Sequence, residues 1–218
     1  MPELAQIVDA IREEFAAKNQ VRDVTLNRSR ELVRFCALSV RAIHRHDWDD
    51  AAGLLKTARE AAAVMVADVA QYPDLYHMGY TQDALKELAE AHLLYAFVHG
   101  NEPPGPAQLG IPAPAYLNGL AEAASELRRF ILDLIRRGQA AEGEPYLATM
   151  DEVYSHLITV DFPESLTGGL RRSTDMLRPV LERTQGDLTV AVRQEELQTA
   201  LRGFEERTAR RSSTAAGK

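Results

Sequence analysis

The sequence predicts an all-α protein, and two observations carry this prediction. Apolar residues recur at steps of three and four along most of the chain, which is the period of an amphipathic helix, and no segment shows the strict alternation of a strand. Prolines and glycines mark the breaks between these periodic segments, above all in the stretch 100–115. With 218 residues, of which 45% are hydrophobic, the chain is long enough for one domain with a large core.

The first predicted element is one long N-terminal helix, or two helices stacked end to end. No proline or glycine occurs between Glu3 and Trp48. An apolar stripe runs along this segment: Leu4, Ile7, Ile11 and Phe15, then Leu32, Phe35, Cys36, Val40 and Ile43. A second helix follows to about residue 71, with Asp47 or Asp49 as its cap. A third is predicted over 81–99.

The second half of the chain contains further helices after a proline-rich loop. Residues 100–115 include five prolines, so we expect no regular structure there. The next helix is predicted over 116–137, and Gly138 suits its C-cap. Three shorter helices are predicted over 144–160, 166–184 and 187–209, with Pro163 and Gly186 at the breaks. We expect a single domain over 1–210 and a disordered tail over 211–218.

Charge and composition narrow the class of protein. The net charge of −7 argues against indiscriminate nucleic-acid binding by the whole surface. Cys36 is the single cysteine, so no internal disulfide can form, and its place on the apolar stripe predicts a buried thiol. No segment has the length and hydrophobicity of a membrane span, and the acidic N-terminus differs from a signal peptide. We therefore expect a cytoplasmic protein with no membrane partner.

Two acidic pairs are the strongest functional candidates. Glu87 and Glu90 are three residues apart, and Glu122 and Glu126 are four apart, so each pair projects from one face of its helix. If the two helices pack face to face, four carboxylates converge, and a divalent cation or shared protons must then neutralise them.

Simpler interpretations of the pairs remain open at this point. Acidic residues on a helix usually face water. Glu87 and Glu90 share a stripe with Leu94, which indicates that they are partly buried. Glu122 and Glu126 lie beside their core stripe together with Arg129, which can simply pair with them.

Four segments resemble the translin/Trax family. Residues 116–129, YLNGLAEAASELRR, resemble its signature helix, which runs Tyr-Leu-x-Gly and later Glu-Leu-x-Arg. Residues 85–91, LKELAEA, resemble the Glu-x-x-Glu-Ala segment of Trax, which translin lacks, and 22–25, RDVT, resemble Arg-Asp-Ile-Thr of Trax. Residues 169–178, GLRRSTDMLR, resemble a Leu-Arg-Lys-x-x-Asp-x-Leu-Lys pattern of translin. The resemblance spans nearly the whole chain.

This resemblance implies a fold, an assembly and a catalytic site. The family fold is a seven-helix, all-α subunit that assembles into a hollow, octamer-like shell. In Trax the acidic positions form a magnesium-dependent endoribonuclease site, whereas translin mainly binds nucleic acid. Glu87, Glu90 and Glu126 match Trax glutamates, and Glu122 stands where Trax has aspartate. We therefore predict that these four residues form the catalytic and metal-binding site for Mg²⁺, or for Mn²⁺ in its place. Glu87, Glu90 and Glu126 are the expected direct ligands, and Glu122 either binds the ion or positions the water.

A nuclease of this type must also hold a phosphate backbone. Residues 21–46 contain six arginines but only two acidic residues, and Arg30, Arg34 and Arg41 lie near one helical face. Arg128 and Arg129 directly follow the acidic helix positions, and Arg129 matches the arginine of the family signature. We predict these five arginines as nucleic-acid contacts, although a solvated helix face explains the first three equally well.

Two functions remain from the sequence. The first is a metal-dependent endoribonuclease that cleaves single-stranded or flexible RNA as a homo-oligomer, expected to be an octamer. The alternative is a non-catalytic, oligomeric protein of the translin type that binds single-stranded RNA or DNA. A ferritin-like di-metal oxidase is disfavoured because its Glu-x-x-His spacing is missing.

Overall fold

The structure, a computed structural model, describes the backbone of residues 2–216 and the side chains of 3–210. Within this part of the chain every regular element is helical, so the all-α prediction is confirmed. The elements are α1 (Pro2–His44), α2 (Trp48–Asp68), α3 (Pro73–Tyr76), α4 (Gly79–His99), α5 (Pro106–Leu109), α6 (Ala113–Arg136), the 3₁₀ turn η1 (Ala140–Gly143), α7 (Glu144–Leu157), α8 (Glu164–Thr167) and α9 (Leu170–Ala216).

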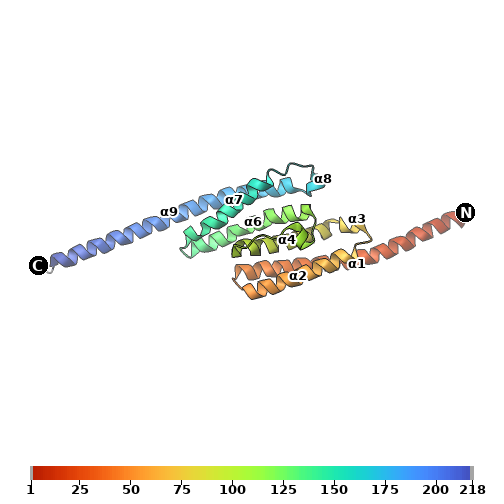
Figure 1. Cartoon of the computed structure of the whole chain (residues 1–218), viewed down its shortest axis with the longest axis horizontal. Coiled ribbons are helices and arrows are strands. Elements are labelled where there is room, and N and C mark those ends of the chain that lie inside the picture. The colour runs from red at the N-terminus through yellow and green to blue at the C-terminus, as the bar shows by residue number, and fades with distance from the viewer. Residues whose placement is uncertain (1, 217–218) are drawn as a thin grey trace.

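The long helices form three layers (Figure 1). α1 and α2 form one layer, α4 and α6 the middle one, and α7 with the first half of α9 the third. The middle layer is the most enclosed, because α4 contacts α1 and α2 on one side and α6 on the other. Its buried residues therefore occur around most of the helix: Ala84, Leu85, Leu88, Ala89, Ala91, Leu93 and Leu94. The acidic pairs thus lie on the two helices of the middle layer.

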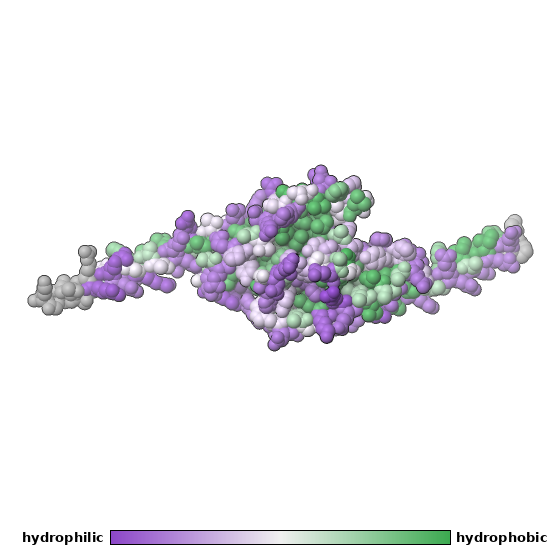
Figure 2. Space-filling view, viewed as in Figure 1, coloured by the Kyte–Doolittle hydropathy of each residue, from purple (hydrophilic) through white to green (hydrophobic). Residues whose placement is uncertain are grey.

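α1 is one continuous helix, and its apolar stripe serves two different environments. Leu32, Cys36 and Ile43 are buried against the body of the protein, as expected. The first part of α1 instead projects beyond the body, where Figure 2 shows a hydrophobic edge. The apolar residues of the stripe in that part are exposed: Leu4, Ile7, Ile11 and Phe15. The stripe predicted both the helix and a buried face, but only its second half is covered within one chain.

The predicted helix break at Gly186 is wrong. α9 runs without interruption from Leu170 to Ala216 and includes both Pro179 and Gly186. Buried residues continue along one face on both sides of Gly186, with Thr184 and Leu188 both fully buried. Glycine in a helix costs about 1 kcal/mol, and burial of this continuous face outweighs that cost.

The end of α9 also projects away from the body, opposite to the start of α1 (Figure 1). The helix extends through Ala216, into the segment for which the sequence predicts a disordered tail. Residues 217 and 218 lie outside the described part. None of the described helices combines the length and the hydrophobicity that crossing a membrane requires.

Candidate metal centre

A glycine allows α4 and α6 to approach closely at the site. Gly119 is buried, and a Cβ atom placed on it would lie 2.6 Å from Cβ of Ala89 and 2.6 Å from the carbonyl oxygen of Lys86. Both neighbouring atoms belong to the backbone or are fixed to it, so a side chain at this position would force the helices apart. This contact places the turn that carries Glu122 opposite the turn that carries Glu87 and Glu90.

Three of the four predicted glutamates come together across this contact. Glu87 and Glu90 from α4 and Glu122 from α6 each offer one carboxylate oxygen, and these oxygens lie within 4.8 Å of one another. All three side chains are partly buried. We call these three residues the carboxylate cluster.

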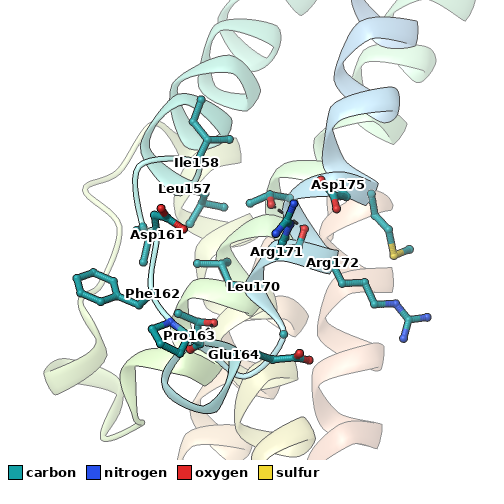
Figure 3. A pocket seen from close by; sticks show the side chains of 15 residues that line it. Leu157, Ile158, Asp161, Phe162, Pro163, Glu164, Leu170, Arg171, Arg172 and Asp175 are labelled. Atoms are coloured by element: carbon teal, nitrogen blue, oxygen red, sulfur yellow. Dashed lines mark hydrogen bonds between the residues drawn. The ribbon is translucent and has the colours of Figure 1, made fainter.

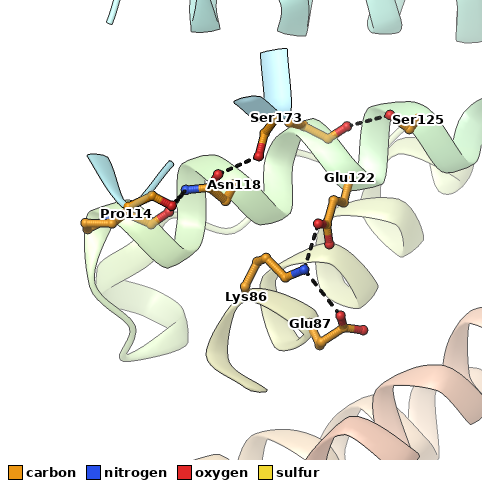
Figure 4. Close-up of polar contacts among 9 residues, drawn as sticks. Lys86, Glu87, Pro114, Asn118, Glu122, Ser125 and Ser173 are labelled. Carbon is orange, nitrogen blue, oxygen red and sulfur yellow. Dashed lines mark hydrogen bonds and ion pairs between the residues drawn. The ribbon is translucent and has the colours of Figure 1, made fainter. Parts of the chain in front are cut away.

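A lysine that the sequence analysis did not single out reaches into the cluster. The ammonium nitrogen of Lys86 lies 2.6 Å from Oε1 of Glu122 and 3.4 Å from Oε1 of Glu87 (Figure 4). It therefore bridges a carboxylate of α4 and a carboxylate of α6.

Glu126 is not among the three glutamates of the cluster, and its carboxylate is hydrogen-bonded to a histidine of α1. Its Oε2 atom lies 2.8 Å from Nε2 of His44, whose side chain is only 2% exposed. The His44 ring also stacks on Phe130, with the ring centroids 4.7 Å apart. From the sequence, the place of His44 near a helix end is explanation enough for a histidine. Its position four residues after Val40 and eight after Cys36 nevertheless places it on the buried stripe, a signal that could have identified it.

The pKa values of the site glutamates reflect the close spacing of their negative charges. Burial raises the pKa of Glu90 to about 8, with further contributions from the charges of Glu87, Glu122 and Glu126. Burial likewise raises the pKa of Glu87. The hydrogen bond from His44 lowers the pKa of Glu126 and keeps that group ionised, and the charge of Arg129 acts in the same direction. A cation beside Glu90 would therefore be favourable.

Stability without metal should fall as the pH rises. The pKa of the Glu90 carboxyl is 4.5 in the unfolded chain and about 8 in the folded one, so the unfolded chain binds fewer protons between these values. We expect the free energy of unfolding in EDTA to decrease over this range by on the order of 2 kcal/mol. Each pKa unit represents about 1.4 kcal/mol, and the partial exposure of Glu90 reduces this contribution. Thermal melts of the wild type and of Glu90→Gln from pH 5 to pH 8 test this, and the decrease should be much smaller in the variant. Parallel pH profiles would contradict the expectation.

A polar anchor fixes α6 against the start of α9. The amide nitrogen of Asn118 donates to the carbonyl oxygens of Thr167, at 2.9 Å, and of Pro114, at 2.8 Å. Its amide oxygen accepts a 2.6 Å hydrogen bond from the hydroxyl of Ser173 (Figure 4). Asn118 and Gly119 are neighbours in the Tyr-Leu-x-Gly segment, so this segment orients α6 against both adjacent helices.

The predicted arginines divide into those without and those with an ion pair. Arg30, Arg34 and Arg41 are exposed on α1, and none of them forms an ion pair with the described residues, although the Arg34 guanidinium lies over the Phe35 ring. Arg129 is exposed and close enough to Glu126 to lower its pKa. Arg128 instead donates to Asp187 at 2.7 Å and to Thr184 at 3.0 Å, and so ties α6 to α9. Arg128 is therefore the weakest of the five candidates for a nucleic-acid contact.

An open cavity of about 1070 Å³ lies away from the cluster, between the end of α7, α8 and the start of α9 (Figure 3). Its lining combines apolar residues such as Leu157 and Phe162 with Arg171 and Arg172. None of the four glutamates lines it.

Comparisons with known proteins agree with this architecture. No protein-family model matches the chain. It is 31% identical over 188 residues to an uncharacterized protein of Methanocaldococcus jannaschii, and the match covers 86% of this chain and 83% of that protein. Among solved structures, AfC3PO and its complex with duplex RNA are each 29% identical to this chain, with TM-scores of 0.77 and 0.76 respectively. Both matches cover 84% of this chain, and they cover 96% of the AfC3PO chain and 95% of the chain in the RNA complex. The apo-NeC3PO structure shares the fold, with a TM-score of 0.76 and 19% sequence identity. The match covers 84% of this chain and 96% of that one. These C3PO proteins are of the translin/Trax type, and the chain belongs to the translin/Trax family.

Proposed function

We propose that this protein is a metal-dependent endoribonuclease whose active centre is the carboxylate cluster. The observation that carries the proposal is the convergence of Glu87, Glu90 and Glu122 from two helices, with one oxygen of each within 4.8 Å of the others. A nucleic-acid-binding protein without catalysis gains nothing from three converging carboxylates, because they repel phosphate. AfC3PO has been solved with duplex RNA, which supports RNA as the ligand of this chain.

The cluster fits a small, hard divalent cation. Glu87, Glu90 and Glu122 would hold such an ion, because each offers one carboxylate oxygen within 4.8 Å of the others and Mg²⁺ prefers oxygen ligands. Carboxylates without histidine or cysteine favour Mg²⁺ or Mn²⁺ over zinc. When bound, such an ion supplies Lewis acidity and neutralises charge that develops on the phosphate during cleavage.

We assign proton transfer to Glu126. The hydrogen bond from His44 lowers the pKa of this carboxyl, which keeps it ionised and leaves it a weakly basic acceptor for a proton of water. Buried His44 fixes the orientation of the carboxylate, since its ring is held by Phe130. In this assignment the three cluster glutamates would hold the ion, and Glu126 would accept a proton from the attacking water.

The exposed arginines of α1 are the proposed RNA-binding surface. At about 100° per residue, Arg30, Arg34 and Arg41 lie within about 40° of one another around the helix. Because such contacts release counterions, each phosphate contact contributes about 0.7–0.9 to the salt dependence of binding.

Replacing Arg30, Arg34 and Arg41 together by glutamine should weaken RNA binding and reduce the slope of log K against log salt by about 2. Fluorescence anisotropy with a labelled RNA at several salt concentrations measures both quantities. The matched control is a triple glutamine variant of Arg136, Arg178 and Arg193, which are exposed, lie outside α1 and form ion pairs within their own helices. Equal slopes for the two triple variants would exclude α1 as the RNA-binding surface.

We further propose that the protein is a homo-oligomer, with an octamer as the expected state. Apolar residues on both projecting helix ends are uncovered in the single chain, including Ile11 and Phe15 on α1 and Leu197, Leu201 and Phe204 on α9 (Figure 2). Exposed apolar stripes of this extent mark protein–protein contacts. Ile11→Glu combined with Phe15→Glu should lower the mass in solution measured by light scattering, whereas a monomeric wild type would exclude the assembly.

The catalytic proposal is tested by RNA cleavage. Labelled single-stranded and duplex RNA are incubated with the protein in Mg²⁺, in Mn²⁺ and in EDTA, and the products are separated on gels. We expect cleavage that requires the cation and that Glu90→Gln abolishes while RNA binding survives. Binding without cleavage in either metal would instead support a non-catalytic protein of the translin type.

A further inference from the structure

Lys86 occupies the place where positive charge is needed in the cluster. Its ammonium nitrogen lies between the two helices, 2.6 Å from Oε1 of Glu122 and 3.4 Å from Oε1 of Glu87 (Figure 4). The Lys86 side chain is 21% exposed, so solvent screens these contacts only in part. Paired with a carboxylate of each helix, this ammonium group brings a positive charge to the cluster.

We propose that Lys86 is the resident counter-cation of the metal-free cluster and competes with the divalent cation for Glu122 and Glu87. This inference rests on the proposed metal centre. Under this proposal either Lys86 or a divalent cation always neutralises the cluster, and Lys86 determines the metal concentration at which the site becomes occupied.

The chemistry of the shared oxygen supports competition. An ammonium 2.6 Å from Oε1 of Glu122 occupies the side of that oxygen that faces the cluster. A divalent cation on the same oxygen would lie close to the ammonium, and the repulsion between them is strong at partly buried positions. Lysine has a flexible stem with four methylene groups, so its head can swing out to solvent without movement of α4. Exchange of one cation for the other therefore needs only a change of side-chain conformation.

The test removes the charge of Lys86 and measures metal binding directly. Protein stripped with EDTA and returned to metal-free buffer is titrated with Mn²⁺ at one fixed pH, and free Mn²⁺ is followed by electron paramagnetic resonance. We expect Lys86→Met to bind Mn²⁺ roughly tenfold more tightly than the wild type, because the competing charge is gone. Its melting temperature without metal should be lower, and the increase on adding Mn²⁺ larger, than for the wild type.

Two variants serve as controls. Lys86→Arg keeps the positive charge and should retain an Mn²⁺ affinity no tighter than that of the wild type. Lys56→Met makes the same substitution at an exposed lysine of α2, away from the cluster, and should leave both the affinity and the melting temperature unchanged. If Lys86→Met folds only when Mn²⁺ is present, that dependence supports the same conclusion.

The outcomes separate this inference from the proposed function. Mn²⁺ binding by the wild type, with equal or weaker binding by Lys86→Met, would overturn the competition and leave the metal centre standing. Absence of Mn²⁺ binding in both proteins would overturn the metal centre and the competition together.

Discussion

Replacing Glu122 by glutamine is expected to abolish both Mn²⁺ binding and RNA cleavage, whereas Glu126→Gln should slow cleavage and leave Mn²⁺ binding intact. Glu122 offers an oxygen to the carboxylate cluster, together with Glu87 and Glu90. Glu126 instead receives the 2.8 Å hydrogen bond of His44. Loss of a ligand charge removes the binding site, but loss of a proton acceptor leaves the ion in place and slows cleavage by about 10²–10⁴-fold.

Two measurements on the same protein preparations distinguish the metal-binding role of Glu122 from the proton-transfer role of Glu126. Titration with Mn²⁺ gives the affinity, and single-turnover cleavage of labelled RNA gives the rate of the chemical step. RNA binding measured in EDTA should be retained in both variants, which controls for folding. Loss of Mn²⁺ affinity in Glu126→Gln equal to that in Glu122→Gln would show that Glu126 is a ligand, as the family resemblance implies, and would contradict the division of roles inferred from geometry.

Most of the helices could be predicted because their signals are local. The long helix before Trp48 follows from its apolar period and from the lack of proline and glycine. Residues 100–112 separate α4 from α6, but the expectation of no regular structure over 100–115 is wrong, because α5 forms there and α6 begins at Ala113. Glycine has a different meaning at different positions. Gly100 adopts a left-handed conformation, with φ of 64°, and ends α4, whereas Gly186 lies within α9. The buried face of α9 continues past Gly186, and only tertiary packing determines that.

The acidic residues of the site could be predicted from the sequence, but the residues that pair with them could not. The spacing of Glu87 and Glu90 indicates a shared face, and the family resemblance points to Glu122 and Glu126. His44 is 82 residues from Glu126, and Lys86 is 36 residues from Glu122. No local pattern relates residues at such separations. Consequently the sequence favours Glu126 over Glu122 as a ligand, whereas the structure places Glu122 in the cluster.

Among the described glycines, Gly119 is the one whose replacement by alanine should destabilise the protein most through contacts of the added methyl group. The new Cβ would lie 2.6 Å from Cβ of Ala89, 2.6 Å from the oxygen of Lys86 and 3.0 Å from the backbone nitrogen of Glu90, so α4 and α6 must separate. Overpacking of this kind costs about 1–3 kcal/mol, which corresponds to a decrease of several degrees in melting temperature for a chain of this length. Separation also moves Glu122 away from Glu87 and Glu90, so Mn²⁺ affinity and cleavage should fall as well.

A second glycine provides the matched control for this change. Gly53 lies within α2 and is exposed, and a Cβ atom added to it would meet no other atom within 4 Å. Gly53→Ala should therefore be neutral or stabilise the protein by up to about 1 kcal/mol through helix propensity alone. Thermal melts and Mn²⁺ titrations of both variants separate propensity from packing. If Gly119→Ala melted at the same temperature as Gly53→Ala and bound Mn²⁺ as the wild type does, the close approach of α4 and α6 would not be what holds the carboxylate cluster together.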